Sequence, residues 1–195
     1  MIRIGENIIS MLNIKKLIKK NTFPCSKKTE LWTSETEFDT AWKKRIELMA
    51  SYIDIPGKVA DFGCGMMWLE NFLKSENSYV PIDYIRRDER TIVIDLNVGP
   101  ISAINAEIAF LSGILEYIED IPKFISQLTD NNFKLIILSY CTLEKNSDVG
   151  VRKSLNWVSH VSLFELLSLF TNKYNLTAID DFNINTILVF KKKTA

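Results

Sequence analysis

The sequence predicts a single α/β domain built on a doubly wound, mostly parallel β-sheet. Short runs of apolar residues recur along the chain, and stretches with helical periodicity separate them. Most of these runs are apolar throughout, which is typical of strands covered by helices on both faces. At 195 residues, the chain is long enough for one domain with a substantial core.

Residues 1–30 are predicted to form an appendage, namely a basic amphipathic helix followed by a linker. Apolar residues recur at near-helical spacing over 8–18, and the first 30 residues hold seven lysines and arginines against two glutamates. Such a helix can rest on an anionic membrane surface, or it can pack on its own domain with its lysines in solvent. The domain itself is expected over 31–195.

Strands and helices alternate in the remainder of the chain. A helical stripe of apolar residues covers 38–53 and is expected to end before Pro56 and Gly57. Further helices are predicted over 68–75, 121–128 and 162–170. Strands are predicted over seven segments: 59–62, 79–82, 92–94, 108–111, 135–138, 176–179 and 187–190. This alternation is the reason for predicting a parallel sheet.

Charge and cysteine content argue against several classes of function. The chain holds 24 basic and 24 acidic side chains, so no overall positive charge indicates nucleic-acid binding. Three cysteines without paired spacing and one histidine argue against a disulfide framework and a zinc site, and suit a reducing cytoplasm. No segment has the ~18 apolar residues of a membrane-spanning helix, and the N-terminus lacks a signal-peptide pattern. A cytoplasmic protein without a metal site is expected.

The most informative segment is Val59-Ala60-Asp61-Phe62-Gly63-Cys64-Gly65, a buried strand followed by a two-glycine turn and a predicted helix. Glycine is needed where the backbone bends sharply and a ligand lies close against it. Open α/β sheets bind ligands at this end of their strands. The carboxylate of Asp61 would repel a pyrophosphate but suits a positively charged ligand, and the third glycine of a dinucleotide-binding turn is absent. NAD and ATP are therefore not expected.

The segment from Asp61 to Gly65 resembles motif I of class I S-adenosylmethionine-dependent methyltransferases, usually written D-x-G-x-G-x-G. The resemblance covers residues 38–193 and implies a seven-stranded sheet with a final antiparallel strand and S-adenosylmethionine as the cofactor. It implies that Gly63 and Gly65 carry the methionine part of the cofactor, beside Asp61. Met67 replaces the third motif glycine, which leaves a non-catalytic relative as an alternative.

In this family, an acid at the end of the second strand holds the ribose hydroxyls, and an acid after the third lies beside the adenine. Asp83 ends the second predicted strand, and a carboxylate can accept two hydrogen bonds from a vicinal diol. Asp95 ends the third, and Leu96 offers the base an apolar surface; Asp95 suits an Asx turn equally well. The resemblance also places Ser112, after the fourth strand, in the cofactor site.

The substrate side is less clearly marked in the sequence. Leu115-Glu116-Tyr117-Ile118 resembles the loop after the fourth strand in this family. Asn156-Trp157-Val158-Ser159-His160 is similar to a Trp-x-x-His segment of small bacterial methyltransferases associated with glycan and polysaccharide genes. His160, the only histidine, is a candidate general base near neutral pH, although it can equally cap the helix that follows. Tyr140 follows the fifth strand at the rim where substrate would arrive, and is the second catalytic candidate.

The expected function is methyl transfer from S-adenosylmethionine to an oxygen or nitrogen of a small molecule or sugar intermediate, in polysaccharide biosynthesis. The main alternative is a relative that binds S-adenosylmethionine without catalysis. A nucleic-acid methyltransferase is disfavoured by the neutral charge and by Ser112-Gly113-Ile114-Leu115, which stands where such enzymes carry an N/D-P-P-Y/F motif. The sequence leaves the acceptor and the oligomeric state open.

Overall fold

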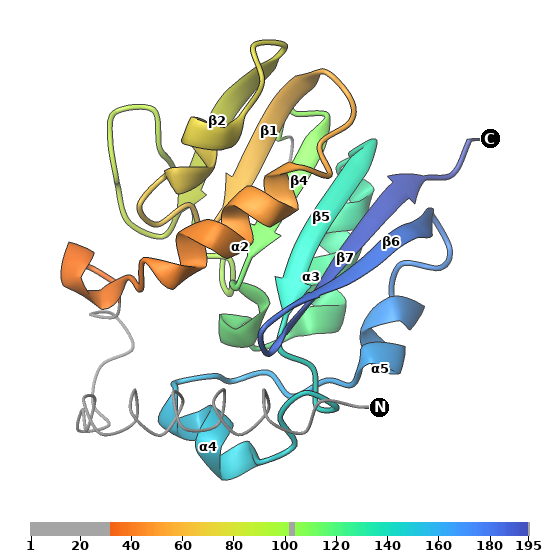
Figure 1. Cartoon of the computed structure of the whole chain (residues 1–195). Coiled ribbons are helices and arrows are strands. Elements are labelled where there is room, and N and C mark those ends of the chain that lie inside the picture. The colour runs from red at the N-terminus through yellow and green to blue at the C-terminus, as the bar shows by residue number, and fades with distance from the viewer. Residues whose placement is uncertain (1–31, 102–103, 195) are drawn as a thin grey trace, which may run out of the picture.

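The computed structural model describes residues 32–101 and 104–194, which build the predicted seven-stranded sheet (Figure 1). The order of the strands is β3-β2-β1-β4-β5-β7-β6. Their bounds are Gly57–Phe62 (β1), Asn77–Asp83 (β2), Ile92–Val93 (β3), Ile108–Ser112 (β4), Leu135–Tyr140 (β5), Tyr174–Phe182 (β6) and Asn185–Lys192 (β7). Each predicted strand is present, whereas the predicted extension at 1–30 lies outside the described residues.

The sheet is parallel except at its last strand. β1 pairs in parallel with β2 and β4, β3 pairs in parallel with β2, and β5 pairs in parallel with β4. β7 runs antiparallel to both β5 and β6. Only Asn183 and Ile184 separate β6 from β7, and a connection this short joins antiparallel neighbours. The prediction of a final antiparallel strand is confirmed.

Three of the four predicted helices are shorter than expected, whereas the one predicted over 121–128 extends to Asp130. The helices are η1 (Glu35–Glu37), α2 (Ala41–Ala50), η2 (Trp68–Phe72), η3 (Leu115–Tyr117), α3 (Ile121–Asp130), α4 (Val149–Ser154) and α5 (Leu163–Ser168), in which η marks a 3-10 turn. The helix expected after the glycine turn is thus the 3-10 turn η2, and α4 was not predicted. No helix within 32–101 and 104–194 is long and apolar enough to cross a membrane.

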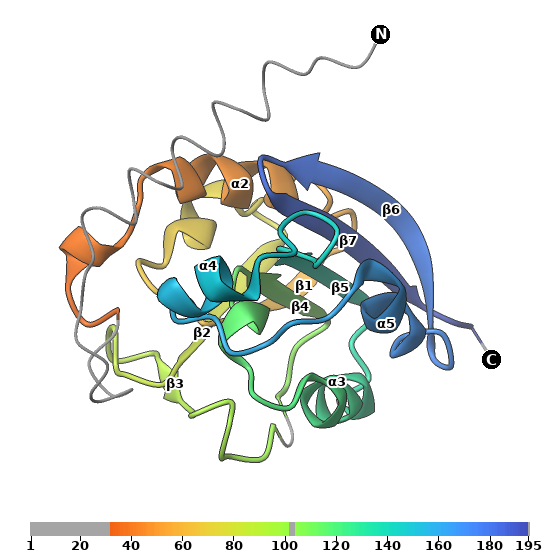
Figure 2. The same ribbon diagram turned by 90° about the horizontal axis from the view of Figure 1, so that it is seen from below.

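Helices cover both faces of the sheet, as Figure 2 shows for α2 and α3. On one face, Met49 of α2 and Leu69 of η2 pack against Val59 and neighbouring strand residues. On the other, Phe124 of α3 and Leu166 of α5 pack against alternate strand residues. This double cover explains why the central strands are apolar throughout.

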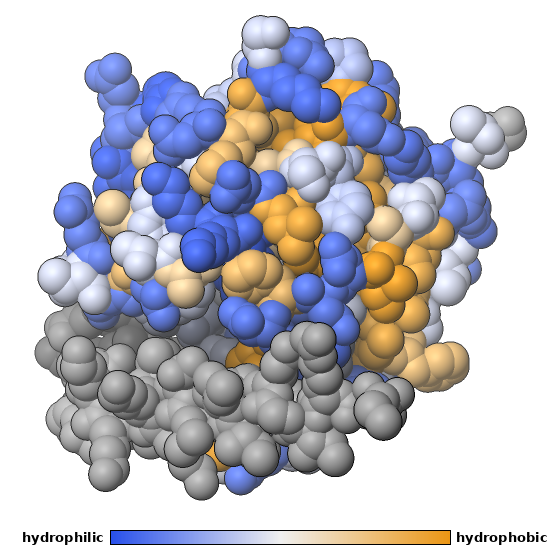
Figure 3. Space-filling model, viewed as in Figure 1, coloured by the Kyte–Doolittle hydropathy of each residue, from blue (hydrophilic) through white to orange (hydrophobic). Residues whose placement is uncertain are grey.

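The edge strands are less covered. Ile92 and Val93 of β3 are 39% and 48% exposed, and Leu176 and Ile179 of β6 are 42% and 53% exposed. In the view of Figure 3, hydrophobic side chains gather on the side of the molecule formed by β6 and β7. The strands that carry the glycine turn and its neighbours therefore lie in the protected middle of the sheet.

Candidate functional site

The glycine turn lies at the carboxyl end of β1 and is tied to β2. The amides of Gly63 and Cys64 donate to the carbonyl of Ile82 at 2.8 and 3.0 Å. Gly63 and Gly65 have φ values of 72° and 49°, in the left-handed region that disfavours other residues. A Cβ atom on Gly65 would also lie 2.6 Å from the ring of Phe38, so this position requires glycine.

Met67 adopts a glycine-like backbone conformation. Its φ and ψ are 55° and 28°, and its amide donates to the carbonyl of Cys64 at 2.7 Å. A non-glycine residue in this region costs about 1 kcal/mol. The backbone therefore keeps the conformation that a third motif glycine would favour, although a half-buried methionine occupies the position.

Asp83 ends β2 with its side chain directed at the turn, and only 3% of the residue is exposed. Its Oδ2 accepts the amide of Gly65 at 2.9 Å and Nε of Arg87 at 3.1 Å. Its Oδ1 accepts the amide of Ile85 at 3.3 Å. The structure thus brings this acid and the glycine turn together, and adds an ion pair with Arg87.

Asp61 lies beneath the same turn and is 5% exposed. The hydroxyl of Tyr79 donates to its Oδ2 at 2.8 Å. Burial raises the pKa of Asp61 to about 7; the charge of Asp83 acts in the same direction, and the bond from Tyr79 opposes it. Two buried carboxyl groups therefore lie at the turn, and one of them titrates near neutral pH.

Side chains from elsewhere in the chain cover the turn. The ring of Phe38 lies against Gly65, and Ile114 lies against Gly63. The guanidinium of Arg87 lies 5.4 Å from the centroid of the Phe38 ring. Three further aromatic rings contact Phe38, namely Trp32, Trp42 and Trp68. The sequence prediction missed this aromatic cover, although the density of aromatic residues over 32–42 was a visible signal.

The other predicted cofactor residues lie in different surroundings. Asp95 is exposed, and its Oδ1 accepts the amide of Asn97 at 2.9 Å, which is the Asx turn considered as an alternative. Leu96 is half-buried and packs against the core on the α3 face. Ser112, at the end of β4, accepts Nε of Arg45 at 3.2 Å.

The two predicted catalytic residues meet through Arg152 of α4, which is completely buried. Arg152 donates to the hydroxyl of Tyr140 at 2.8 Å, to the carbonyl of Ser159 at 3.0 Å, and to Nδ1 of His160 at 3.1 Å. It also donates to the carbonyl of Cys141 at 2.7 Å. The sequence pattern did not indicate Arg152, because α4 is only six residues long.

The contact with Arg152 determines which nitrogen of His160 carries hydrogen. A neutral imidazole that accepts at Nδ1 is protonated at Nε2, and so offers a donor there. Burial and the charges of Arg152 and Lys153 lower the pKa of His160 and favour this neutral form. His160 does not cap α5: the capping oxygen is Oγ of Ser162, which accepts the amide of Glu165 at 3.2 Å.

A second buried polar group lies at the carboxyl ends of β4 and β5. Glu116 is 2% exposed, and its Oε1 accepts the amide of Cys141 at 2.9 Å and the Asn185 amide group at 3.3 Å. Asn185 in turn accepts Nη1 of Arg45 at 2.8 Å. Burial raises the pKa of Glu116, and the charge of Arg45 opposes this shift. In the sequence, Glu116 belongs to the segment that resembles the loop after the fourth strand of the family, but nothing there indicated its contacts with Cys141 and Asn185.

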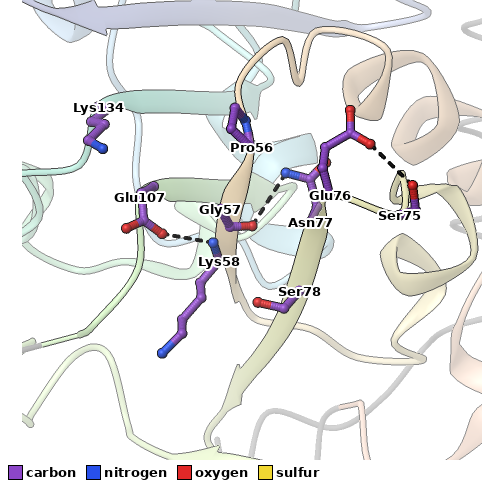
Figure 4. Close-up of a pocket in the computed structure, with 9 residues that line it drawn as sticks. All are labelled: Pro56, Gly57, Lys58, Ser75, Glu76, Asn77, Ser78, Glu107 and Lys134. Carbon is purple, nitrogen blue, oxygen red and sulfur yellow. Dashed lines mark hydrogen bonds between the residues drawn. The ribbon is translucent and has the colours of Figure 1, made fainter.

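A surface cavity lies at the other end of the sheet (Figure 4). It measures about 510 Å³ and is lined at the amino ends of β1 and β2 by Pro56, Gly57, Lys58, Ser75, Glu76, Asn77 and Ser78, together with Glu107 and Lys134. Glu107 accepts the amide of Lys58 at 2.8 Å. This cavity is separate from the glycine turn, because parallel strands place the turn at their carboxyl ends.

No protein-family model matches the chain, and no curated protein sequence matches it. Its structure is similar to the N-methyltransferase NodS from Bradyrhizobium japonicum WM9 in complex with S-adenosylhomocysteine. In that comparison the TM-score is 0.61 and the identity 10%, over 93% of this chain and 100% of NodS.

Two other solved methyltransferases show the same likeness. One is the 1,6-didemethyltoxoflavin-N1-methyltransferase of Burkholderia thailandensis, with a TM-score of 0.60 and 11% identity, over 100% of this chain and 93% of that one. The other is the O-methyltransferase NcsB1 from neocarzinostatin biosynthesis. Its TM-score is 0.61 and its identity 16%, over 97% of this chain and 70% of NcsB1. The chain therefore has the Rossmann-like methyltransferase fold.

Proposed function

We propose that this chain is an S-adenosylmethionine-dependent methyltransferase acting on an oxygen or nitrogen of a small molecule. The observation that carries the proposal is the bond between Asp83 and the amide of Gly65, at the turn where this fold binds ligands. Solved structures of the same fold hold S-adenosylmethionine or S-adenosylhomocysteine, which supports the choice of cofactor.

The charges at the turn fit this cofactor. Asp61 and Asp83 are buried carboxyl groups, and S-adenosylmethionine carries a positive sulfonium and a positive ammonium group. The ribose hydroxyls would bind to Asp83 and would replace Arg87 as its partner. Arg45 and Ser112 would hold the charged methionine end, with Gly63 and Gly65 beneath it. Asp95 and Leu96 stay the predicted contacts of the adenine.

When bound, the cofactor supplies an electrophilic methyl group. Methyl transfer depends mainly on the alignment of donor and acceptor, so few side chains need to take part in the chemistry. Arg152 would hold in place Tyr140, which is completely buried, and His160, which is only partly buried. With Nε2 protonated, His160 would donate a hydrogen bond to the acceptor and would not take a proton from it.

A sugar or polysaccharide intermediate is the finer proposal for the acceptor. It depends on the resemblance of the segment from Trp157 to His160 to glycan-associated methyltransferases. In this structure the segment wraps around Arg152, whose guanidinium lies 5.0 Å from the Trp157 ring. Cytoplasmic location, membrane contact through residues 1–30 and a domain spanning 31–195 remain predictions.

Calorimetry on the full-length chain tests the proposal. We expect S-adenosylhomocysteine to bind the wild-type protein, and Asp83→Asn to weaken binding more than tenfold, because hydrogen bonds to a charged group contribute about 1.5–3 kcal/mol. Asp130→Asn, at the exposed end of α3, is the control. Absence of binding to the wild-type chain would refute the proposal.

A methyl-release assay on small hydroxyl and amine compounds, including sugars, separates the enzyme from its main rival. Turnover identifies the enzyme. Binding of the cofactor with no turnover on any such acceptor favours a non-catalytic binding protein.

A further inference from the structure

Glu116 carries a buried oxygen without a partner. Its Oε1 holds the amides of Cys141 and Asn185, but its Oε2 is buried and has no hydrogen-bond partner within the described parts of the chain. A buried carboxylate oxygen is normally satisfied, because removing it from water without a compensating bond is costly. The role of Oε1 in capping β5 explains only half of this side chain.

The groups around Glu116 are fixed in place. Asn185 bridges Glu116 and Arg45, and Arg45 donates in addition to Ser112. Arg45 lies against the backbone at Gly113, where an added Cβ atom would come within 2.6 Å of its guanidinium. Glycine at 113 thus allows the arginine to approach. The carboxylate therefore sits in a preformed polar site beside the proposed methionine end of the cofactor.

This site adjoins the rim of the sheet. Glu116 follows β4; its preceding neighbour Leu115 is completely buried, whereas Ile114 and Tyr117 are half-buried. Ile114 is the residue that covers Gly63 of the turn. A molecule that reaches the cofactor across this rim would therefore approach Glu116 from the partly exposed side.

We propose that Oε2 of Glu116 accepts a hydrogen bond from the group that is to be methylated. This inference rests on the proposed methyltransferase function and deepens it by naming the class of acceptor. An ionised carboxylate only accepts hydrogen bonds, so the partner is a hydroxyl or an amine that bears hydrogen. The same charge repels a carboxylate acceptor, and a tertiary amine or a thioether has no hydrogen to offer.

Sinefungin tests this inference without the natural acceptor. In this analogue of S-adenosylmethionine, an amine-bearing carbon replaces the methyl-bearing sulfur, so its ammonium group points toward the acceptor site. Calorimetry on the full-length protein would compare sinefungin with S-adenosylhomocysteine. We expect the wild-type chain to prefer sinefungin at least tenfold. Glu116→Gln should bring this preference close to one and leave S-adenosylhomocysteine affinity within threefold.

Two further variants keep the test decisive. Glu116→Asp keeps the charge but retracts it by one methylene, so it should reduce the preference for sinefungin several-fold. This variant provides the test if the glutamine variant does not fold. Glu107→Gln is the matched control, since Glu107 also accepts a backbone amide but lies at the opposite end of the sheet. It should leave the preference unchanged.

Thermal denaturation adds a readout that separates binding from a structural role. Glu116→Gln keeps an oxygen that can accept the amides of Cys141 and Asn185 but removes the negative charge near Arg45, so only a moderate fall in melting temperature is expected. A large fall in melting temperature with an unchanged preference would assign Glu116 a purely structural role and overturn the inference. Failure of the wild-type chain to bind S-adenosylhomocysteine would reject the proposed function as well.

Discussion

The amide of Gly65 donates a hydrogen bond of 2.9 Å to the carboxylate of Asp83. This bond joins the turn after β1 to the end of β2, so the two predicted parts of the cofactor site form one unit. Asp83 also pairs with Arg87, which covers the carboxylate that the ribose would need. In the proposed cofactor site, Asp83 is thus already joined to Gly65, and Arg87 occupies part of its carboxylate.

Removal of Arg87 should strengthen cofactor binding. The guanidinium must leave Asp83 before ribose hydroxyls can bind there, so Arg87→Met should raise the affinity for S-adenosylhomocysteine several-fold in calorimetry. The neighbouring Arg86 is exposed, and Arg86→Met is the matched control with unchanged affinity. Weaker binding in Arg87→Met would show instead that Arg87 contacts the cofactor.

Met67 provides a test of backbone strain. Because its φ is 55°, Met67→Gly should be about 1 kcal/mol more stable than Met67→Ala, both variants having lost the side chain. The opposite order is expected at exposed Lys44 within α2, where glycine is less stable than alanine by a similar amount. Urea denaturation measures all four variants. Equal stability of the two Met67 variants would contradict the strain.

The stability of the ligand-free protein should depend on Asp61. Because the folded pKa is about 7 and the unfolded value near 4, the unfolded chain releases this proton first as pH rises. Asp61 therefore lowers the free energy of unfolding progressively between about pH 4 and pH 7. Relative to the wild-type chain, Asp61→Asn should gain stability across this window and hold a constant advantage above it. Denaturation at several pH values measures this difference, and a flat difference would contradict the raised pKa.

Arg152 should be essential for stability. Arg152→Lys keeps the charge but loses most of the bonds to Tyr140, His160 and the carbonyls around them, and should lower the free energy of unfolding by about 3 kcal/mol or more. Arg90→Lys alters an exposed arginine paired with Glu70 and should cost less than about 1 kcal/mol. Chemical denaturation compares the two, and equal losses would refute a special role for the buried arginine.

Local patterns in the sequence predicted the elements that local physics controls. The apolar runs marked all seven strands of the described sheet. The central strands must be apolar because helices cover both of their faces, and the edge strands β3 and β6 carry apolar runs although they are partly exposed. The glycine pair predicted the turn, and the family resemblance implied that Asp83 belongs to the same site. The prediction of a regular helix after the turn was wrong in type. Met67 adopts a left-handed backbone conformation, and a 3-10 turn follows it. The six-residue α4 was too short to show a period.

The sequence by itself therefore determined the layered α/β class, the strand positions and the glycine turn, because each follows from neighbouring residues or from a short, regular spacing. Only the tertiary structure decided the polar groups beyond the turn. Arg45 meets Asn185 across 140 positions, and Glu116 meets Asn185 across 69. Such pairs depend on how strands are ordered in the sheet, and periodicity along the chain carries no information about contacts over these separations.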